Sequence, residues 1–333
     1  MNTGKYTLVT GGAGFIGSAL IHALNESGNT NIVVADILGM DEKFKNLIPL
    51  RYADYIEADD LIELAEEEPD YFDQFETIFH LGACSATTER DASYLIRNNY
   101  EYTKTLASIA IDKGIRFVYA SSAATYGDGS QGMDDTIEDL HALNPLNMYG
   151  YSKHMFDCYA QRMDWDDKIV GLKYYNVFGP NEAHKGDMRS LVAKSYEQIQ
   201  ATGEIGLFKS YHPDYTDGNQ MRDFLYVKDA VAMTIHLANT PSANGLFNLG
   251  SGQANTWNTL AIAIFDALKL KPNIQYIDMP EQLKDKYQYY TCANTDKLRS
   301  SGYTADGYNL QDAVIDYVQN YLVTGKHLGQ EHS

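Results

Sequence analysis

The sequence predicts an α/β protein in which a parallel sheet is flanked by helices and capped by a smaller lobe. In the first half of the chain, short apolar runs alternate with amphipathic helical stretches, and a glycine-rich turn joins the first run to the first helix. After about residue 176 the alternation becomes less regular. Strands that alternate with helices connect through right-handed βαβ crossovers into a parallel sheet, so we expect the first half to supply the sheet and the second half most of the lobe.

Apolar periodicity predicts the individual elements in order along the chain. The runs expected to form strands are residues 6–10, 32–35, 77–81, 117–120 and 169–174, and the helical stretches between them are residues 15–27, 92–113 and 149–163. In the second half we expect helices at 188–202 and 228–238, strands at 223–227, 246–249 and 274–277, and a polar, turn-rich loop at 210–220.

The composition argues against several classes of partner. With 26 Lys and Arg against 45 Asp and Glu, the formal net charge is −19. A field of that sign repels nucleic-acid phosphates and anionic lipid, so we expect neither as a partner. The three cysteines lack the spacing of a zinc site, and no metal is predicted. No signal peptide and no apolar run of about 20 residues is found, so we expect a cytoplasmic protein.

The glycine-rich turn has the spacing of a dinucleotide site. Gly11, Gly14 and Gly17 follow the first predicted strand and open the first predicted helix. Glycines let the backbone turn tightly and approach a pyrophosphate at a helix N-terminus. Asp36, at the end of the second strand, can bind the adenosine ribose and favours NAD. Lys43 can neutralise a 2′-phosphate and favours NADP, so the residues alone leave the choice of cofactor open.

A second pattern points to proton transfer. Tyr149 and Lys153 lie four residues apart in a predicted helix and share one face. An ammonium beside a phenol stabilises the phenolate and lowers the tyrosine pKa from about 10, so such a tyrosine can take a proton from an alcohol as hydride leaves. Ser121 and Ser122 follow a predicted buried strand, where their hydroxyls can either bond the reacting oxygen or cap a turn.

Together these patterns resemble the extended short-chain dehydrogenase/reductase family, also described as the NAD-dependent epimerase/dehydratase family, over nearly the whole chain. A narrower resemblance is to the nucleotide-sugar epimerases that act on ADP-heptose. The stretches that carry it are residues 82–89, 121–127, 149–153, 175–180, 184–186, 207–210, 222–224 and 287–288. The segments around Thr87-Thr88-Glu89 and His184-Lys185-Gly186 are the most selective of these.

The resemblance implies a modified Rossmann, doubly wound parallel sheet with a smaller mixed α/β substrate lobe. We place the NAD(P)-binding domain at residues 1–175 with 224–248 and the substrate lobe at residues 176–223 with 249–333. The implied activity is epimerisation at C6″ of ADP-D-glycero-D-manno-heptose for lipopolysaccharide precursors, with NADP kept bound and NAD as the alternative. The family also suggests a homo-oligomer, specifically a pentamer.

The resemblance assigns roles to individual residues as well. Tyr149 and Lys185 would be two acid/base groups, because hydride returns to the opposite face of the sugar carbonyl and the sugar oxygen takes two positions. Lys153 would hold the nicotinamide ribose and tune Tyr149. The residues expected to contact the cofactor are Gly11, Gly14, Phe15, Ile16, Gly17, Asp36, Ile37, Lys43, Leu81, Gly82, Ala83, Cys84, Ser85, Asn98, Lys153, Val177 and Lys185. Those expected to contact the substrate are Asn176, Asp187, Lys194, Phe208, Lys209, Ser210, Arg222 and Tyr287.

The substrate assignments are less uniform than the cofactor assignments. Arg222 suits a diphosphate, because its guanidinium fork matches two phosphate oxygens. Asp187 and Lys194 stand where close relatives carry serine and histidine, and Ala58 replaces a lysine near the adenosine phosphate. These departures affect the fine substrate contacts, and the loss at position 58 weakens the preference for NADP.

Three alternatives to this activity remain. A sugar-nucleotide dehydratase needs acids just after the catalytic hydroxyl, where this chain has Ala123 and Ala124. A C4 epimerase of the UDP-sugar type shares the cofactor chemistry and differs only in the substrate lobe, where Lys185 favours the heptose substrate. A non-catalytic NAD(P)-binding sensor could lose the tyrosine or the lysine, and both are present.

Overall fold

A seven-stranded parallel sheet forms the centre of the molecule. The computed structural model describes residues 4–284 and 287–330. The strands are β1 (Tyr6–Thr10), β2 (Ile32–Asp36), β3 (Asp54–Glu57), β4 (Phe75–His80), β5 (Arg116–Ser122), β6 (Ile169–Tyr174) and β10 (Gly245–Leu249). They lie in the order β10-β6-β5-β4-β1-β2-β3, and each neighbouring pair is parallel. The predicted α/β class with a doubly wound parallel sheet is confirmed.

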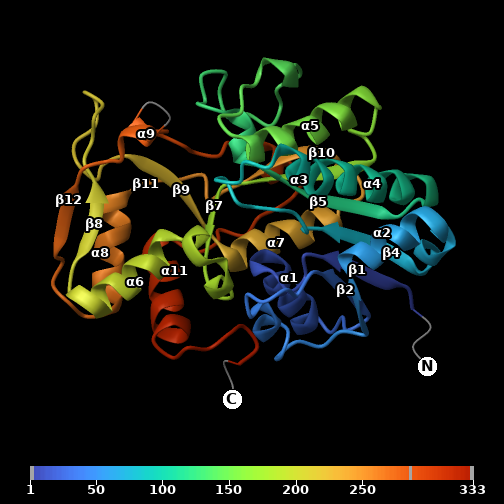
Figure 1. Cartoon of the computed structure of the whole chain (residues 1–333), viewed down its shortest axis with the longest axis horizontal. Helices are drawn as coiled ribbons and strands as arrows, with labels where there is room; N and C mark the ends of the chain where they lie inside the picture. Colours follow the sequence, from blue (N-terminus) through green and yellow to red (C-terminus); the bar gives the residue numbers. More distant parts are fainter. Residues whose placement is uncertain (1–3, 285–286, 331–333) are drawn as a thin grey trace.

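Helices cover both faces of this sheet (Figure 1). The helices are α1 (Phe15–Glu26) and α7 (Val227–Ala238) on one face, and α2 (Ala58–Glu67), α4 (Tyr102–Lys113) and α5 (Met148–Arg162) on the other. Successive residues of one strand enter different cores: Val9 packs with the α1 and α7 side, and Leu8 with the α2, α4 and α5 side. Because the side chains of a strand alternate between faces, a strand buried on both faces reads as a continuous apolar run.

The second half of the chain builds a smaller lobe beside the sheet, at the left of Figure 1. Its strands form a three-stranded sheet in the order β11-β9-β7 and a two-stranded sheet of β12 and β8. The strands are β7 (Asn176–Phe178), β8 (Ile205–Phe208), β9 (Met221–Tyr226), β11 (Ala254–Thr256) and β12 (Ile274–Ile277), and the helices are α6 (Leu191–Thr202), α8 (Trp257–Ala267), α9 (Glu281–Lys284), α10 (Asp296–Ser300) and α11 (Leu310–Asp316).

Some elements differ from the sequence-based expectations. The strand expected at 223–227 is β9, which pairs with β7 and β11. The helix expected at 92–113 is α3 (Ala92–Leu95), a π-helical segment (Ile96–Glu101) and α4. Neither β3 nor α2 was predicted from the sequence. The strand β3 gave no signal because it is a half-exposed edge strand without an apolar run.

The division of the chain into a NAD(P)-binding domain and a substrate lobe remains a prediction. Residues 1–3, 285–286 and 331–333, which that division also assigns, lie outside the described ranges. Within the described ranges, no helix is both long and apolar enough to cross a bilayer.

The strand order places a functional site at a defined edge of the sheet. The order reverses between β1 and β4, since the chain runs outward from β1 through β2 to β3 and then returns to β4 on the other side. In open parallel sheets, ligands bind outside the carboxyl ends of the strands at such a reversal. The chain also leaves the sheet at the end of β6 to enter the lobe through β7, so both lobes meet at this edge.

Candidate active site

A cleft of about 610 Å³ opens at this edge of the sheet. It is lined by the turn after β1, the end of β2, the loop after β4, the end of β5, the start of α5 and the segment after β6. The predicted catalytic and cofactor residues that line it are Gly11, Gly14, Phe15, Ile16, Gly17, Asp36, Lys43, Leu81, Gly82, Ala83, Cys84, Ser85, Ser122, Tyr149, Lys153, Val177 and Lys185. Segments more than 170 residues apart in the sequence therefore share one cavity.

The glycine-rich turn is packed against the loop that follows β4. Gly11 has a φ of +66°, and a Cβ added there would lie 2.7 Å from the Cα of Gly82. The two backbones can approach this closely only because Gly11 has no side chain, and its positive φ is a conformation that other L-residues rarely adopt. The turn opens α1 directly, with Gly14 as its N-cap, so backbone N–H groups face the cleft, as a bound pyrophosphate requires.

We expect Gly11→Ala to weaken both the fold and cofactor binding. The left-handed backbone costs about 1–3 kcal/mol for a residue with a side chain, and the contact with Gly82 adds to it. Gly114→Ala is the matched control, because Gly114 has a φ of +65° and a Cβ there would have nothing within 4 Å. Urea unfolding should show the larger loss for Gly11→Ala. Equal losses would mean that the close approach to Gly82 has no energetic weight.

Asp36 and Lys43 are joined directly in the structure. The Lys43 ammonium donates to Asp36 Oδ1 over 2.8 Å, and the backbone N–H of Ala13 donates to Asp36 Oδ2 over 2.9 Å. The acid that favours NAD and the lysine that favours NADP are thus ion-paired with each other. Lys43 therefore offsets the repulsion that Asp36 alone would exert on a 2′-phosphate.

The residues predicted to transfer protons lie where β5 ends and α5 begins. Asn147 caps α5 by accepting from the N–H of Gly150 over 2.8 Å, which fixes the first turn that carries Tyr149. Lys153 follows one turn later and is 4% exposed. Ser122 is the last residue of β5, and its hydroxyl also caps the next turn by accepting from the N–H of Ala124 over 3.1 Å. This geometry is compatible with both roles that the sequence left open for Ser122, which are to bond the reacting oxygen and to cap a turn.

Burial dominates the acid–base properties of this pair. It raises the pKa of Tyr149 above its ordinary value, while the hydrogen bond with Ser122 lowers it and the nearby thiol of Cys84 raises it. The same desolvation lowers the pKa of Lys153 to about 8, against the opposing charge of Asp157. The direction for Tyr149 is opposite to the one expected from the Tyr-x-x-x-Lys spacing, because losing water destabilises a phenolate more than the surrounding groups stabilise it.

Lys185 reaches the cleft from the other side. It lies in a short helical segment (Ala183–Met188) of the lobe, and its ammonium is 5.3 Å from the ring centroid of Phe15 on α1. Burial lowers the pKa of Lys185, and the charge of Glu182 opposes that shift. A lysine with a lowered pKa exchanges protons more readily near neutral pH.

The predicted substrate residues are distributed over the lobe. Asn176 lines the cleft. Arg222 is buried on β9, and its guanidinium carbon is 5.0 Å from the Tyr287 ring centroid and 5.7 Å from the Trp257 ring centroid. Lys194 donates to the carbonyl of Asp187 over 3.3 Å. The remaining predicted residues are Phe208, at the end of β8, Lys209, whose ammonium pairs with Asp278 over 3.1 Å, and Ser210, whose hydroxyl donates to the carbonyl of His212.

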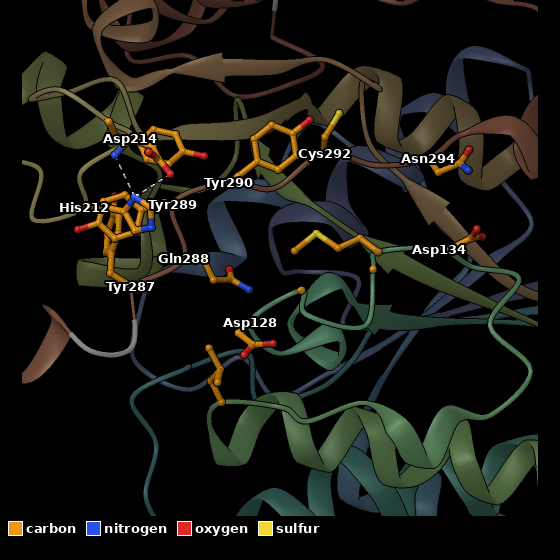
Figure 2. Close-up of a pocket in the computed structure, with 15 residues that line it drawn as sticks. Asp128, Asp134, His212, Asp214, Tyr287, Gln288, Tyr289, Tyr290, Cys292 and Asn294 are labelled. Carbon is orange, nitrogen blue, oxygen red and sulfur yellow. Dashed lines mark hydrogen bonds and ion pairs between the residues drawn. The ribbon is translucent and has the colours of Figure 1, made fainter.

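Tyr287 also lines a second cavity, of about 810 Å³, between the lobe and the loop after β5 (Figure 2). At one end of it, Figure 2 shows Tyr287, Tyr289 and His212 close together, and the rings of His212 and Tyr289 are 5.0 Å apart. Within the part of the chain that the structure describes, its lining contains no Lys or Arg. An anionic group is therefore better placed on the Arg222 side of Tyr287 than in this cavity.

The lining of the cleft differs from the sequence-based prediction at several residues. Ile37 and Asn98, which were predicted to contact the cofactor, do not line the cleft in the described chain, and the Asn98 amide donates to the carbonyl of Tyr94. The neighbouring Asn99 is buried and bonds both the N–H and the carbonyl of Cys84. A π-helical turn takes an extra residue, so helical periodicity could not tell which of the two asparagines faces inward. Tyr175 lines the cleft as well, with a buried hydroxyl that has no hydrogen-bond partner among the described residues.

A glycine-rich cradle and a Tyr–Lys pair that open into one cleft characterise a Rossmann-fold enzyme that uses a nicotinamide cofactor. The family model described as "NAD dependent epimerase/dehydratase family" matches residues 7–250. The chain belongs to this family, and a nicotinamide cofactor follows from the membership.

Several similar proteins bear the name of one particular enzyme within this family. An ADP-L-glycero-D-manno-heptose-6-epimerase of Nitratidesulfovibrio vulgaris (strain DP4) is 51% identical over 315 residues, covering 95% of this chain and 97% of the relative. The enzyme of the same name from Fusobacterium nucleatum is 43% identical over 330 residues, with 95% and 97% covered. The crystal structure of the Helicobacter pylori enzyme of that name superposes with a TM-score of 0.79 at 28% identity, covering 95% of this chain and 96% of that one.

Proposed function

We propose that this chain is an ADP-L-glycero-D-manno-heptose 6-epimerase, which interconverts the D-glycero and L-glycero forms of ADP-heptose at C6″. The observation that carries the proposal is that Tyr149, Lys153, Ser122 and Lys185 line the same cleft as the glycine-rich turn. Full-length relatives at 51% and 43% identity that bear this enzyme's name support it.

In the proposed epimerisation, each of these residues has a separate role. When bound, the nicotinamide cofactor supplies a hydride acceptor and donor. Tyr149, as the phenolate, takes the proton of the C6″ hydroxyl while Ser122 bonds the same oxygen. The Lys153 ammonium stabilises that phenolate against the burial that raises the Tyr149 pKa. Once the carbonyl has turned to present its other face, Lys185 returns a proton to the oxygen in its second position. Arg222 binds the diphosphate, since its fork matches two phosphate oxygens.

A direct assay tests this function. The purified protein, incubated with ADP-D-glycero-D-manno-heptose, should produce a mixture of the two C6″ epimers, which proton NMR distinguishes. UDP-glucose serves as the comparison substrate, because C4 epimerases share the cofactor chemistry. Conversion of UDP-glucose without conversion of ADP-heptose would transfer the chain to the C4 type, and loss of water from the sugar would make it a dehydratase.

We also propose NADP as the cofactor, on the strength of the ion pair between Lys43 and Asp36. Charge-assisted hydrogen bonds contribute about 1.5–3 kcal/mol, so Lys43→Ala should weaken NADP binding by roughly tenfold or more and leave NAD binding much less affected. Fluorescence titration of cofactor-stripped protein with each dinucleotide measures this. If both affinities fall equally, Lys43 does not read the 2′-phosphate.

We further propose, from the family resemblance, that the chain forms a homo-oligomer, specifically a pentamer. Light scattering coupled to gel filtration of the purified chain would give its mass in solution and test that assembly.

A further inference from the structure

A fully buried ion pair lies beneath the candidate active site. The Lys173 ammonium on β6 is 2.8 Å from Asp157 Oδ2 on α5, and the two side chains are 1% and 0% exposed. The Asp157 carboxylate also accepts from the hydroxyls of Ser121, over 2.7 Å, and Tyr119, over 2.9 Å. Lys173 donates to the hydroxyl of Thr125 over 2.6 Å. Both charges are therefore held in a hydrogen-bonded network closed off from water.

The members of this network lie close in the chain to proposed catalytic or substrate-binding residues. Asp157 follows Lys153 by one turn of α5, so the two side chains share a helix face. Ser121 precedes Ser122 and is the cross-strand partner of Lys173. The hydroxyl of Thr125 donates to the carbonyl of Ser122 over 2.8 Å. The network around this ion pair therefore joins three elements: α5, which holds Tyr149; β5, which ends at Ser122; and β6, which leads to Asn176.

Stability alone is a weak explanation for such a pair. Burying two charges is costly, and replacing a buried ion pair with apolar side chains of similar size is often neutral or stabilising. Fully satisfied buried polar networks do hold their elements in one arrangement. We propose that Asp157 and Lys173 are positioning residues, which fix α5 against the ends of β5 and β6 and keep an anion one turn from Lys153 so that Lys153 stays charged. This inference rests on the proposed acid/base function of Tyr149 and Lys153.

The electrostatics of Lys153 agree with this arrangement. Burial lowers the pKa of Lys153 to about 8, and the charges of Asp157 and Cys84 oppose that shift. His80 on β4 also interacts with Lys153, and its own pKa is held low by burial and by the charge of Lys153. As pH rises through about 8, Lys153 loses its proton and with it the stabilisation of the Tyr149 phenolate. Removing the charge of Asp157 should move that loss to a lower pH.

The test is the double variant Asp157→Asn/Lys173→Met. Asparagine keeps an acceptor oxygen for one of the two hydroxyls, Ser121 or Tyr119, and its amide NH₂ can donate to the oxygen of the other. Methionine fills the space of the lysine stem, so no charge is left buried without a partner. The control is Lys228→Met/Asp316→Asn, a less buried ion pair that joins α7 to α11. There the ammonium is 2.7 Å from Asp316 Oδ2, and the same carboxylate accepts from the hydroxyl of Tyr226 over 2.6 Å. Neither control residue lines the cleft.

Two measurements distinguish a role of Asp157 and Lys173 in positioning the active-site residues from a role in stabilising the fold alone. In the cofactor-bound protein, NMR of isotope-labelled lysine, assigned with Lys153→Met, follows the Lys153 titration and needs no substrate. We expect a lower Lys153 midpoint in the double variant, because the anion that holds the proton on Lys153 is gone, and no change in the control. With ADP-heptose, kcat should fall roughly 100-fold, as expected for a displacement of about 1 Å in an active site, and its alkaline limb should move to lower pH, with KM little changed.

The inference is overturned if the double variant titrates and turns over like wild type, or if the control pair has the same effects. Thermal unfolding of both variants verifies that each is folded. If wild type does not convert ADP-heptose at all, the proposed function fails, while the Lys153 titration still decides whether Asp157 keeps that lysine charged.

Discussion

Tyr149→Phe is expected to lower kcat for epimerisation by about 100- to 10,000-fold, the range that positioned general acid–base groups contribute. The change removes one hydroxyl and keeps the ring that packs at the start of α5. Because the cofactor contacts proposed here lie mainly in the turn after β1 and the loop after β4, the variant should still fold and bind the dinucleotide. The NMR epimer assay measures the rate, and absorbance of the purified protein measures the bound cofactor.

Tyr151→Phe is the matched control, because Tyr151 lies on the same helix and is 47% exposed. We expect that variant to keep the wild-type rate. A Tyr149→Phe enzyme with a near-normal rate would remove the phenol from the chemistry. A rate lost together with the cofactor would instead show that Tyr149 holds the dinucleotide.

Lys185→Met should produce the second large effect, a loss of roughly 100-fold or more in kcat. The reason is geometric: one proton donor cannot serve a sugar oxygen that occupies two positions, and Lys185 enters the cleft from the lobe whereas Tyr149 enters from α5. Methionine removes the ammonium that lies over the Phe15 ring, can still pack its thioether against that ring, and cannot carry a proton.

Lys168→Met is the comparison for this second variant, since Lys168 is exposed in the loop before β6. We expect its rate to match wild type in the same epimer assay. If Lys185→Met and Lys168→Met have equal effects, Lys185 has no part in proton transfer, and a single acid/base group must serve both faces of the sugar.

The sequence by itself determined the fold class and predicted many of the residues that line the cleft. Residues 6–17 specify strand, turn and helix through local apolar periodicity and glycine spacing, and the structure has β1 and α1 there. Tyr149 and Lys153 lie four apart, so any helix places them on one face. Such patterns are local, and for this reason they can be recognised without knowing how distant segments pack.

Tertiary structure decided what depends on burial and on segments far apart in the chain. The pKa of Tyr149 is raised rather than lowered because the cleft removes water from the phenol. Asn99 rather than Asn98 reaches the loop after β4, because a π-helical turn shifts the phase of the helix. The ion pair of Asp157 with Lys173 joins α5 to β6, and no periodic spacing in the sequence predicts this contact. Desolvation and long-range contacts are properties of the packed molecule, and the order of residues does not reveal them until the chain has folded.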